Sequence, residues 1–442
     1  MRKPSPPPEF GELLANAAQA DRLAKIHNAV TTPLVQGKYL SWGELQYHTP
    51  PTGLSLEEWW LGLKLQRAST QPIPLQAGSG LPFKYLQVDP IPEQLHEMDL
   101  GAGGDIQMPD PIVNPQLRDR YYVSSLIEEA ITSSQLEGAV TTRVIAEDML
   151  RSGRTPNDRS EKMIFNNFIT MRRIGELKDE PLTRDLVLEI HRLITEGTLD
   201  DPTATGRFRR AEENIVVGDM YGEIYHQPPP ASQLDHRMRA MCDFANGKTP
   251  GGFVHPVLRS ILLHFWLAYD HPFVDGNGRT ARSLFYWSML RHRYWLCEFL
   301  SISPLILKAP SRYQLAFLHT EIDDNDLTYF ILYHLDLLHR ALRQLHEYLH
   351  RKSEQARKME ISLQGLAALN HRQRALMSHA IRHPHQIYTV ESHQTSHKVV
   401  YETARKDLLD LAQRGLLVAK KHKKTWHFTP AADLESRLSH RP

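Results

Sequence analysis

The spacing of apolar residues predicts helices along most of the chain. From residue 117 to about residue 360, apolar side chains recur three or four positions apart, as at Leu126, Ile127, Ala130 and Ile131. This spacing places them on one face of an α-helix. The chain is therefore predicted to be mostly α, with a helical domain over its middle.

One segment inside the helical region follows a different pattern. Two short runs of β-branched and aromatic residues, 215–217 and 224–225, lie on either side of Gly218 and Gly222. Runs of this composition around glycines are typical of a β-hairpin. A two-stranded hairpin is only marginally stable alone, so residues 213–230 are predicted to form either a supported surface hairpin or a functional flap.

The two ends of the chain differ from its middle. The first hundred residues open with a proline-rich tail and indicate no particular fold. Near the C-terminus, helical spacing over 370–382 and 399–414 is followed by two short strands around a lysine-rich turn. Two helices and a two-stranded wing, in this order, are typical of a winged helix. The expected parts are an N-terminal accessory region over 1–110, the helical domain over 111–340, a helical connector over 341–365 and a winged helix over 366–442.

Composition and charge are those of an ordinary soluble protein. The 442 residues are 41% hydrophobic and 23% charged, with a formal net charge of +1, as in globular domains. Cys242 and Cys297 are expected to be buried free thiols in a reducing compartment. The N-terminus lacks the apolar core of a secretory signal, and no apolar run approaches the roughly 18 residues of a membrane helix. A cytoplasmic protein without a membrane partner is expected.

The segment 271–282, HPFVDGNGRTAR, carries the strongest chemical signal. It joins an apolar helix over 262–270 to a second helix, so it is predicted to be a loop that runs into a helix N-terminus. Free backbone N–H groups and the helix dipole make such a place an anion site. Gly276 and Gly278 allow the backbone to approach phosphates closely. Asn277 tolerates the unusual turn conformations that such a nest needs.

Charged side chains of the same segment suit phosphate chemistry. Arg279 and Arg282 are three positions apart on one helical face, and together they can hold two phosphate groups. Asp275 is expected to bind Mg²⁺, which takes one or two carboxylates together with phosphate oxygens. His271 is the only obvious base nearby and could take a proton from an attacking hydroxyl. Each residue alone is more often structural, and only the combination indicates function.

This combination resembles the motif of the Fic family, H-P-F-x-[D/E]-G-N-G-R-x-x-R, and every fixed position is matched from His271 through Arg282. The resemblance covers about residues 115–340. It implies a helical fold and transfer of AMP from Mg·ATP to a Ser, Thr or Tyr hydroxyl of a protein. In a related branch the glycines are altered and phosphate is transferred, so the intact GNGR favours AMP. Transfer of another nucleotide stays an alternative.

The resemblance also implies a role for each motif residue. A loose further match puts a polar residue near Asp323 where relatives contact the nucleotide. By motif position, the implied roles are general base for His271, metal ligand for Asp275, anion hole for Gly276, Asn277 and Gly278, binding of the distal phosphates for Arg279 and Arg282, and anchoring of the loop in the core for Phe273.

The predicted hairpin lies where Fic proteins have a flap that docks the target by strand pairing. It follows residues 206–209, GRFR, which resemble the family's G-x-[YF]-R stretch. The residues expected at this docking surface are Val216, Val217, Gly218 and His226. An ordinary surface hairpin is the alternative.

A second motif lies upstream of the first. Residues 121–138 are predicted to form one helix that ends at Gly138, a natural C′ residue. Glu137 then lies at the negative end of the helix dipole, where a carboxylate is unfavourable. Ser133 and Glu137 match the family's inhibitory motif [S/T]-x-x-x-E-[G/N], whose glutamate pairs with the second motif arginine, here Arg282. The pairing would hold ATP in an unproductive position, which implies the self-inhibited class with an N-terminal inhibitory helix.

Two alternatives concern the same glutamate. Residues 134–137 also fit a capping box, which would begin a helix at this point instead of ending one. In some relatives the inhibitory glutamate helps water to remove AMP from the target, so de-adenylylation is a second candidate activity of Glu137.

The C-terminal region supports a hypothesis of a different class. Arg405 and Lys406 would lie on the recognition helix of the winged helix, and Lys421 and Lys423 on its wing, where they could contact DNA phosphates. Such modules also dock proteins, and a DNA-binding regulator with a redundant catalytic domain is therefore an alternative. The partners expected are a protein substrate, DNA and, as in related proteins, a second copy of the chain.

Overall fold

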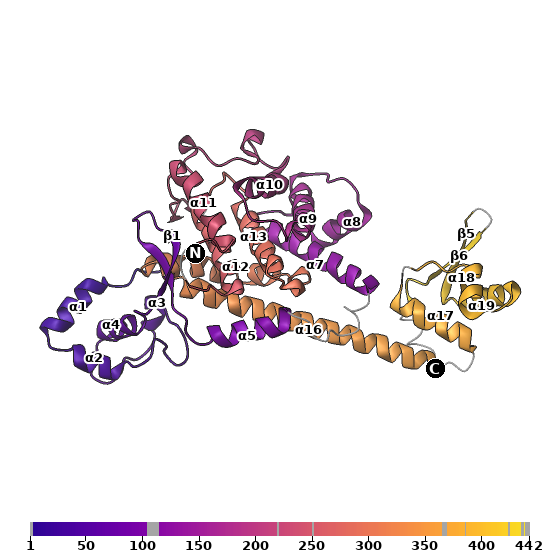
Figure 1. The fold of residues 1–442 in the computed structure, drawn as a ribbon, viewed down its shortest axis with the longest axis horizontal. Coiled ribbons are helices and arrows are strands. Elements are labelled where there is room, and N and C mark those ends of the chain that lie inside the picture. The colour runs from indigo at the N-terminus through magenta and orange to yellow at the C-terminus, as the bar shows by residue number, and fades with distance from the viewer. Residues whose placement is uncertain are drawn as a thin grey trace. The chain divides into compact units, whose positions relative to one another are not determined.

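The structure, a computed structural model, describes residues 3–103, 115–218, 221–249, 252–364, 369–384, 386–422, 425–434 and 437. The chain divides into two compact units, one of residues 1–106 and 124–342 and the other of residues 107–123 and 343–442. It is mostly α-helical, as the apolar spacing predicts (Figure 1).

The helices of the described residues are α1 (Phe10–Gln19), α2 (Leu23–Ala29), α3 (Trp42–Leu45), α4 (Leu56–Gln66), α5 (Ile91–Ala102), α7 (Pro115–Leu136), α8 (Arg143–Ser152), α9 (Arg159–Leu177), α10 (Arg184–Thr195), α11 (Leu234–Ala245), α12 (Pro256–Asp270), α13 (Asn277–Arg291), α14 (Ser303–Lys308), α15 (Pro310–Ile322), α16 (Thr328–Gln364), α17 (His371–Arg382), α18 (Val390–His397) and α19 (Tyr401–Gln413). Three antiparallel strand pairs accompany them, β1 (Gln71–Gln76) with β2 (Pro82–Tyr85), β3 (Val217–Gly218) with β4 (Ile224–His226), and β5 (Leu417–His422) with β6 (Thr425–Pro430).

Helices α12 and α13 form the centre of the first unit. They pack against each other, and α9, α10 and α11 pack around them (Figure 1). A helix that is apolar on nearly all sides is stable only when it is buried, and α12 is such a helix. Helix α13 also carries polar residues and is buried along its length, with Leu284, Phe285 and Trp287 fully buried.

A buried ion pair fixes the end of α12, directly before the phosphate-binding segment. Arg237 of α11 donates to Asp270 through Nε at 2.8 Å, and the indole of Trp266 donates to the other carboxylate oxygen at 3.0 Å. Arg237 also donates to the backbone oxygen of Gln76 in β1. Because a buried charge is tolerated only when it is paired, this cluster holds α11, α12 and β1 in one arrangement.

The N-terminal residues have an apolar core of their own. Trp59 and Trp60 of α4 pack there with Leu13, Ile26 and Leu45, which explains the apolar stretch that carries both tryptophans. Residues 1–106 nevertheless belong to the same compact unit as the central helices.

The connection to the central helices is polar. Lys64 pairs with Asp323 at 2.8 Å, and the phenol of Tyr39 donates to Asp326 at 2.5 Å. The hydroxyl of Tyr329 donates to the second oxygen of Asp323 at 2.8 Å. Asp323 itself is therefore buried and engaged by protein groups, and nucleotide contact by a polar residue near it stays a prediction.

The predicted hairpin exists, with shifted strands. Gly218, expected in the turn, belongs to β3 and pairs with Ile224, while Val217 pairs with His226. Residues 219 and 220, at the turn, lie outside the described residues. The first strand is therefore Val217–Gly218 instead of 215–217, and it ends one residue closer to the turn.

Helix α7 begins earlier than predicted and ends where predicted. It starts at Pro115 instead of residue 121 and runs to Leu136, and Gly138 has a φ of +92°. The Ala139 N–H donates to the Ser134 oxygen and the Gly138 N–H to the Gln135 oxygen, at 3.0 and 3.1 Å. This pair of bonds is a Schellman motif, which ends a helix. The capping-box alternative for residues 134–137 is therefore wrong.

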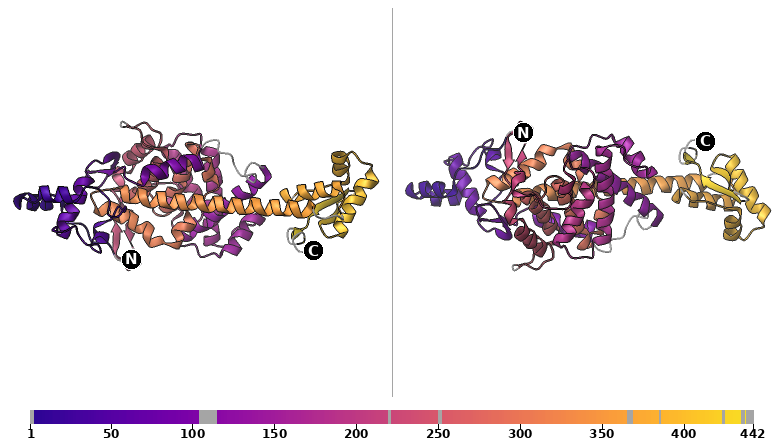
Figure 2. Two further views of the ribbon diagram at one scale, coloured as in Figure 1. Left: turned by 90° about the horizontal axis from the view of Figure 1, so that it is seen from below. Right: turned by 90° about the horizontal axis from the view of Figure 1, so that it is seen from above.

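Helix α16 joins two of the expected parts. It is one continuous helix that includes the end of the expected helical domain and the expected connector (Figure 2). In the second unit, α17, α18, α19 and the β5–β6 hairpin enclose an apolar core that includes Met377, Leu408, Leu411 and Phe428. Helices followed by a two-stranded hairpin are the order expected of a winged helix, and this interpretation stays a prediction.

Two further expectations concern cysteines and membranes. Cys242 and Cys297 are both buried free thiols, as predicted, while the reducing compartment stays a prediction. Within the described ranges, every helix is too short or too polar to cross a membrane.

Replacing Gly62 by alanine should destabilise the protein, although alanine normally favours a helix interior by about 1 kcal/mol over glycine. A Cβ atom at Gly62 in α4 would lie 2.7 Å from a methyl carbon of Val30, and overpacking of this kind costs about 1–3 kcal/mol. We expect a lower midpoint in urea unfolding followed by circular dichroism. The control is Gly11→Ala in α1, where the nearest atom is 3.9 Å away. Equal midpoints for the two variants would contradict this packing.

Candidate functional site

The segment 271–276 forms a tight loop between α12 and α13. His271 ends α12 with a φ of +44° and Gly276 precedes α13 with a φ of +83°. A left-handed conformation suits glycine, and space requires glycine too, since a Cβ at Gly276 would lie 2.7 Å from the methyl group of Thr195. The loop therefore ends in a helix N-terminus, as predicted.

Asn277 has a different part from the one expected. It is the first residue of α13, and the left-handed conformations belong to its neighbours. Its side chain accepts from the Phe273 N–H at 3.0 Å and donates to the Phe273 oxygen at 2.9 Å. The amide thus closes the loop from inside, and only the backbone N–H of Asn277 is left for an anion.

Phe273 fixes the loop to α10. Its ring is fully buried and lies parallel to the ring of His191, with 3.7 Å between the ring centroids. His191 accepts the Gly206 N–H at Nδ1, at 3.1 Å, so its proton is on Nε2, which donates to the Asp275 oxygen at 2.9 Å. Burial lowers the pKa of His191 to about 4. The neutral His191 ring therefore supports the loop by stacking on Phe273 and by its hydrogen bond to Asp275.

Arg209 holds the other side of the loop. Its Nε donates to the His271 oxygen at 2.7 Å, its Nη2 donates to the Pro229 oxygen after the hairpin, and its backbone N–H donates to the Pro272 oxygen at 2.8 Å. The GRFR stretch thus connects the loop and the hairpin through one guanidinium. Neither Arg209 nor His191 was assigned a role from the sequence.

Arg279 is a buried cation that is only weakly paired. It is 1% exposed, and its Nε and Nη2 have no hydrogen-bond partner. Nη1 makes one long bond, 3.4 Å, to the Ile194 oxygen, and Asp275 is 3.9 Å away. Burial lowers the pKa of Arg279 against the opposing effect of Glu137 and Asp275. Buried guanidinium donors without partners are costly, so this position fits an anionic ligand.

Arg282 is engaged by α7 and by Glu137, which directly follows it. Its Nε donates to the Ser133 hydroxyl at 2.8 Å, and its Nη2 donates to the Ser133 oxygen at 3.0 Å and to Glu137 Oε1 at 2.8 Å. A Cβ added to Gly278 would lie 2.1 Å from the same carboxylate oxygen. The Glu137 carboxylate therefore lies directly on the N-terminal turn of α13, where an anion is favoured.

The protonation of Glu137 follows from these contacts. Burial raises the pKa of this carboxyl, but the charges of Arg282 and Arg279 and the hydrogen bond from Arg282 outweigh burial and hold the pKa below its ordinary value. A carboxyl with a lowered pKa gives up its stabilising contact only as pH falls into the acid range. Glu137 is ionised at neutral pH.

His271 is neutral and oriented. Its Nδ1 lies 3.3 Å from the Ala268 oxygen, and because a carbonyl can only accept, the proton is on Nδ1 and Nε2 has the free lone pair. Burial lowers the pKa of His271 to about 4. A side chain in this state is able to take a proton at neutral pH.

Asp275 fits a single-carboxylate metal site. Its side chain is 44% exposed at the entrance to α13, beside the orphaned Arg279 donors. Within the described residues, three or more His, Cys, Asp or Glu side chains nowhere gather closely enough to hold a metal ion among themselves. That is the situation in which Mg²⁺ is bound by one carboxylate together with phosphate oxygens.

The hairpin and the loop line one cavity of about 280 Å³. Val217 and Gly218 contribute from β3, His271 and Arg282 from the motif, and α15 forms the opposite wall. Val216, also assigned to the flap, is 42% exposed beside this cavity. The structure therefore brings the predicted flap and the predicted phosphate site together.

The ring of His226 is mostly buried and is held by protein groups. It is 8% exposed, with Nε2 at 2.7 Å from the Tyr269 oxygen and Nδ1 at 2.7 Å from Glu321 Oε2. Both nitrogens are therefore engaged by protein groups and connect β4 to α12 and α15, while the residue is among those that line the cavity. A part for His226 in target docking stays a prediction.

The residues assigned to DNA contact lie in the second unit. Arg405 and Lys406 are exposed on α19, and Lys421 is exposed on β5. Arg405 makes a long surface contact with Glu402 at 3.4 Å. Lys423 lies outside the described residues. DNA binding by these residues stays a prediction.

Comparison with known proteins identifies the central part of the chain. Residues 181–289 match the Fic/DOC family. The chain is 28% identical over 200 residues to the protein adenylyltransferase Fic of Nematostella vectensis, covering 45% of this chain and 43% of that protein. It is 30% identical over 165 residues to the protein adenylyltransferase Fic of Aedes aegypti, covering 37% of this chain and 29% of that protein. The chain thus spans less than half the length of these relatives.

A solved structure shows the same fold. It is a Fic family protein from Desulfovibrio desulfuricans G20, which superposes with a TM-score of 0.53 at 20% identity and covers 79% of this chain and 98% of that one. The likeness includes much of the chain beyond the 109-residue stretch matched at 181–289. The mostly α fold with a Fic domain is confirmed.

Gly276→Ala should both destabilise the protein and weaken ATP binding. The left-handed φ disfavours alanine by about 1 kcal/mol, and the contact with Thr195 adds about 1–3 kcal/mol. Gly153→Ala is the matched control, with a φ of +71° and open space around the Cβ. Urea unfolding and ATP titration calorimetry would measure both effects. The predicted contact is absent if the two variants lose the same stability.

Proposed function

Because this chain carries a Fic domain, we propose that it is a protein adenylyltransferase that transfers AMP from Mg-ATP to a Ser, Thr or Tyr hydroxyl of a target protein, and that Glu137 inhibits it. One observation carries the proposal. The anion site at the N-terminus of α13 has an orphaned guanidinium, Arg279, and a second one, Arg282, occupied by a carboxylate of the same chain. Both guanidinium groups suit phosphate oxygens, and the Glu137 carboxylate occupies one of them in place of a phosphate.

The reaction uses His271 as its base. The target hydroxyl oxygen attacks the α-phosphorus of ATP, the bond from that phosphorus to the bridging oxygen of the β-phosphate breaks, and pyrophosphate leaves. The hydroxyl proton moves to Nε2 of His271, whose lone pair is free because Nδ1 faces the Ala268 oxygen. The product is a phosphodiester between AMP and the target side chain. A positioned base of this kind contributes about 10²–10⁴-fold to the rate.

The first turn of α13 and the side chain of Arg279 bind the phosphates of ATP. Backbone N–H groups of the first turn of α13 and the free donors of Arg279 bind phosphate oxygens. Asp275 would hold Mg²⁺, which neutralises part of the phosphate charge.

Inhibition follows from competition for Arg282. In the inhibited state its donors are engaged by Ser133 and Glu137, and the carboxylate repels a phosphate from the same place. ATP that binds without this contact does not bring its α-phosphate in line with the target hydroxyl.

The target approaches along the hairpin. Val217 and Gly218 line the cavity that contains His271, and an extended segment that pairs with β3 would place its hydroxyl near the base. Backbone pairing gives affinity with little demand on sequence. His226 supports this role by fixing β4 to the protein through Tyr269 and Glu321.

Glu137→Gly should raise AMP transfer at least about ten-fold, because it frees Arg282 to bind a phosphate of ATP. A ten-fold increase in rate corresponds to only about 1.4 kcal/mol of transition-state stabilisation. Adding His271→Ala should reduce transfer by about 10²–10⁴-fold. Label on the protein and on a lysate would be measured with ATP labelled at the α or the γ phosphate. Glu128→Gly on the same helix is the control, since Glu128 pairs with the exposed Arg143 away from the site.

The position of the label separates the alternatives. Label from the α-phosphate alone supports AMP transfer. Label from the γ-phosphate would mean phosphate transfer and would refute the proposal. Equal labelling by wild type, Glu137→Gly and Glu128→Gly would refute inhibition by Glu137. Loss of AMP from a pre-modified target without new transfer would favour de-adenylylation.

The pH dependence of the released enzyme should reflect the low pKa of His271. A general base works when it is unprotonated, and with a pKa of about 4 the kcat of Glu137→Gly should be flat from pH 8 to pH 5 and fall only toward pH 4. Removing Glu137 takes away a charge that raises this pKa, so the variant should not titrate higher. A fall centred near the ordinary histidine value of about 6.5 would contradict the burial of the base.

A further inference from the structure

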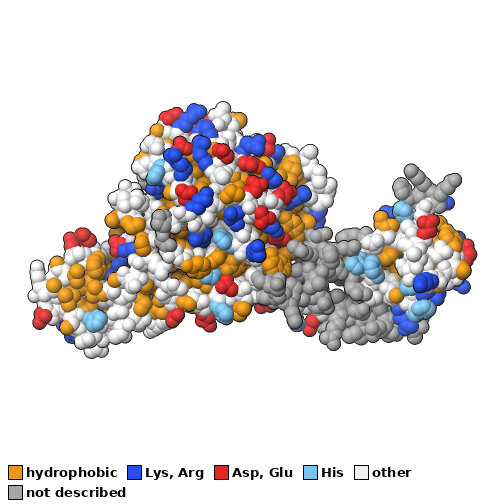
Figure 3. Space-filling model, in the orientation of Figure 1, with side chains coloured by type: hydrophobic (Ala, Val, Ile, Leu, Met, Phe, Trp, Pro, Cys, Tyr) orange, Lys and Arg blue, Asp and Glu red, His pale blue; other side chains and the backbone are white. Residues whose placement is uncertain are grey.

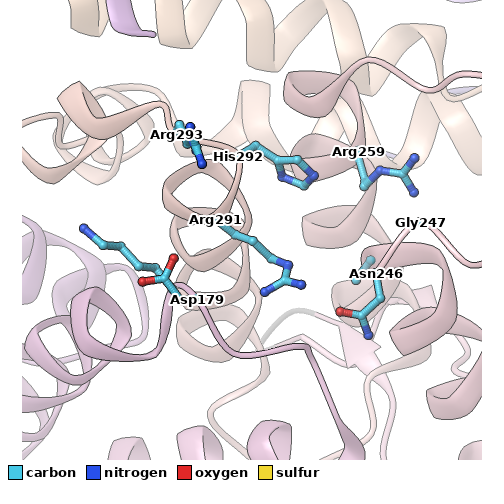
Figure 4. A pocket seen from close by; sticks show the side chains of 9 residues that line it. Asp179, Asn246, Gly247, Arg259, Arg291, His292 and Arg293 are labelled. Atoms are coloured by element: carbon cyan, nitrogen blue, oxygen red, sulfur yellow. The ribbon is translucent and has the colours of Figure 1, made fainter. Parts of the chain in front are cut away.

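A second hollow lies at the opposite end of α13 from the phosphate site. Its volume is about 420 Å³, and it is formed where α9, α11 and α13 end, with one residue contributed by α12 (Figure 4). Four basic side chains line it, from Lys178, Arg259, Arg291 and Arg293, together with one carboxylate, from Asp179. It shares no lining residue with the cavity that contains His271.

The basic side chains of the hollow have few ion-pair partners. Over the face of the helical domain seen in Figure 3, basic and acidic side chains are interspersed. In contrast, Arg259, Arg291 and Arg293 have no carboxylate within ion-pair distance in the described part of the chain. Only Lys178 has an acidic partner, Glu298, at 3.3 Å. The hollow therefore has an excess of uncompensated positive charge.

Part of this charge has a structural use. Cations favour helix C-termini, and Arg291 donates from Nη1 to the Glu180 oxygen at 2.8 Å, while Arg259 donates from Nη1 to the Phe244 oxygen. Each contact occupies one of the five N–H groups of a guanidinium. The remaining donors are not buried without a partner, so they are open to solvent and to a ligand. Among the described residues, no such contact involves Arg293, which lies just after α13.

The same positive charge affects His292, the histidine that lines the hollow. The His292 Nδ1 donates to the Ser288 oxygen at 2.7 Å, which leaves Nε2 free. Burial lowers the pKa of His292, and the neighbouring Arg259 and Arg291 lower it further. The positive potential is therefore felt by a group inside the hollow.

We propose that this hollow is a second ligand site, which binds a small anion through a phosphate group. Arginine donors suit phosphate because two parallel N–H groups can contact two oxygens at once. The volume exceeds that of a phosphate alone, and Asp179 at the rim can accept from a hydroxyl or ammonium group of the rest of the ligand. A phosphate ester fits both features. The site is independent of the proposed transfer reaction, because it lies away from the loop, the hairpin and α7.

The test is calorimetric titration of the full chain with inorganic phosphate and with glycerol 3-phosphate, at about 0.15 M salt to screen weak surface attraction. Arg259→Gln/Arg291→Gln should weaken binding at least about ten-fold, since charge-assisted hydrogen bonds are the strong ones. The control is Arg172→Gln/Arg239→Gln, which removes the same charge from exposed positions outside the hollow. Arg279→Gln tests whether the anion binds at the motif instead.

A milder variant protects the test against misfolding. Arg293→Gln removes a side chain without an internal partner, so melting temperature should not change while affinity falls. The His292 ring gives a second readout, by NMR of histidine-labelled protein assigned with His292→Gln. A bound anion offsets the charges of Arg259 and Arg291, so the pKa of His292 should rise.

The outcomes are distinct. Loss of binding in the hollow variants alone, with Arg279→Gln unaffected, supports the site. Tighter binding of glycerol 3-phosphate identifies an ester as the ligand, and equal binding identifies free phosphate. Equal losses in the hollow and control variants would mean unspecific charge attraction and would overturn the proposal. So would loss in Arg279→Gln alone, an unchanged His292 titration, or no binding of either probe.

Discussion

The architecture around the site depends on the need for an anion at the N-terminal end of α13. Two buried guanidinium groups, Arg279 and Arg282, reach a helix end that is already positive. Buried positive charge is tolerated only when negative charge accompanies it. In this structure Glu137 supplies the negative charge, held by Arg282 and in contact with Gly278. In the proposed reaction the phosphates of ATP supply it, so the two states exchange one anion for another at a fixed receptor.

The anion site can keep its shape when the anion is exchanged, because the contacts that hold the loop 271–276 do not involve the anion. Phe273 is held by the Asn277 amide and by stacking on a neutral His191, and Arg209 uses backbone oxygens. These contacts involve none of the groups that an incoming phosphate needs. Burial is the reason that Arg279 and Arg282 require a neighbouring anion. Burial also keeps His271 neutral and able to accept a proton.

The sequence predicted what is local and missed what depends on distant segments. The loop at 271–282 was predictable because glycines, a helix boundary and two arginines lie within twelve residues. The end of α7 was predictable from Gly138, but its start was not, since residues near Pro115 carry a breaker and no apolar pattern. His191 and Arg209 were missed because their partners in the loop, Asp275 and His271, are 84 and 62 positions away. The contacts of His226 were not predictable because the sequence cannot show on which side of the three-residue strand β4 a ring is buried.

The sharing of Arg282 and Gly278 between inhibition and ATP binding limits how such a protein can change over generations. On the proposed function, a mutation of either residue removes the activity together with its control, so it cannot produce an unrestrained enzyme. Unrestrained variants can arise only from the α7 side, where Ser133 and Glu137 contribute to the closed state but not to phosphate binding. The motif and its inhibitor are therefore unequal targets of selection. Loss of control is accessible from a few positions of one helix, while the receptor itself is protected because it serves both states.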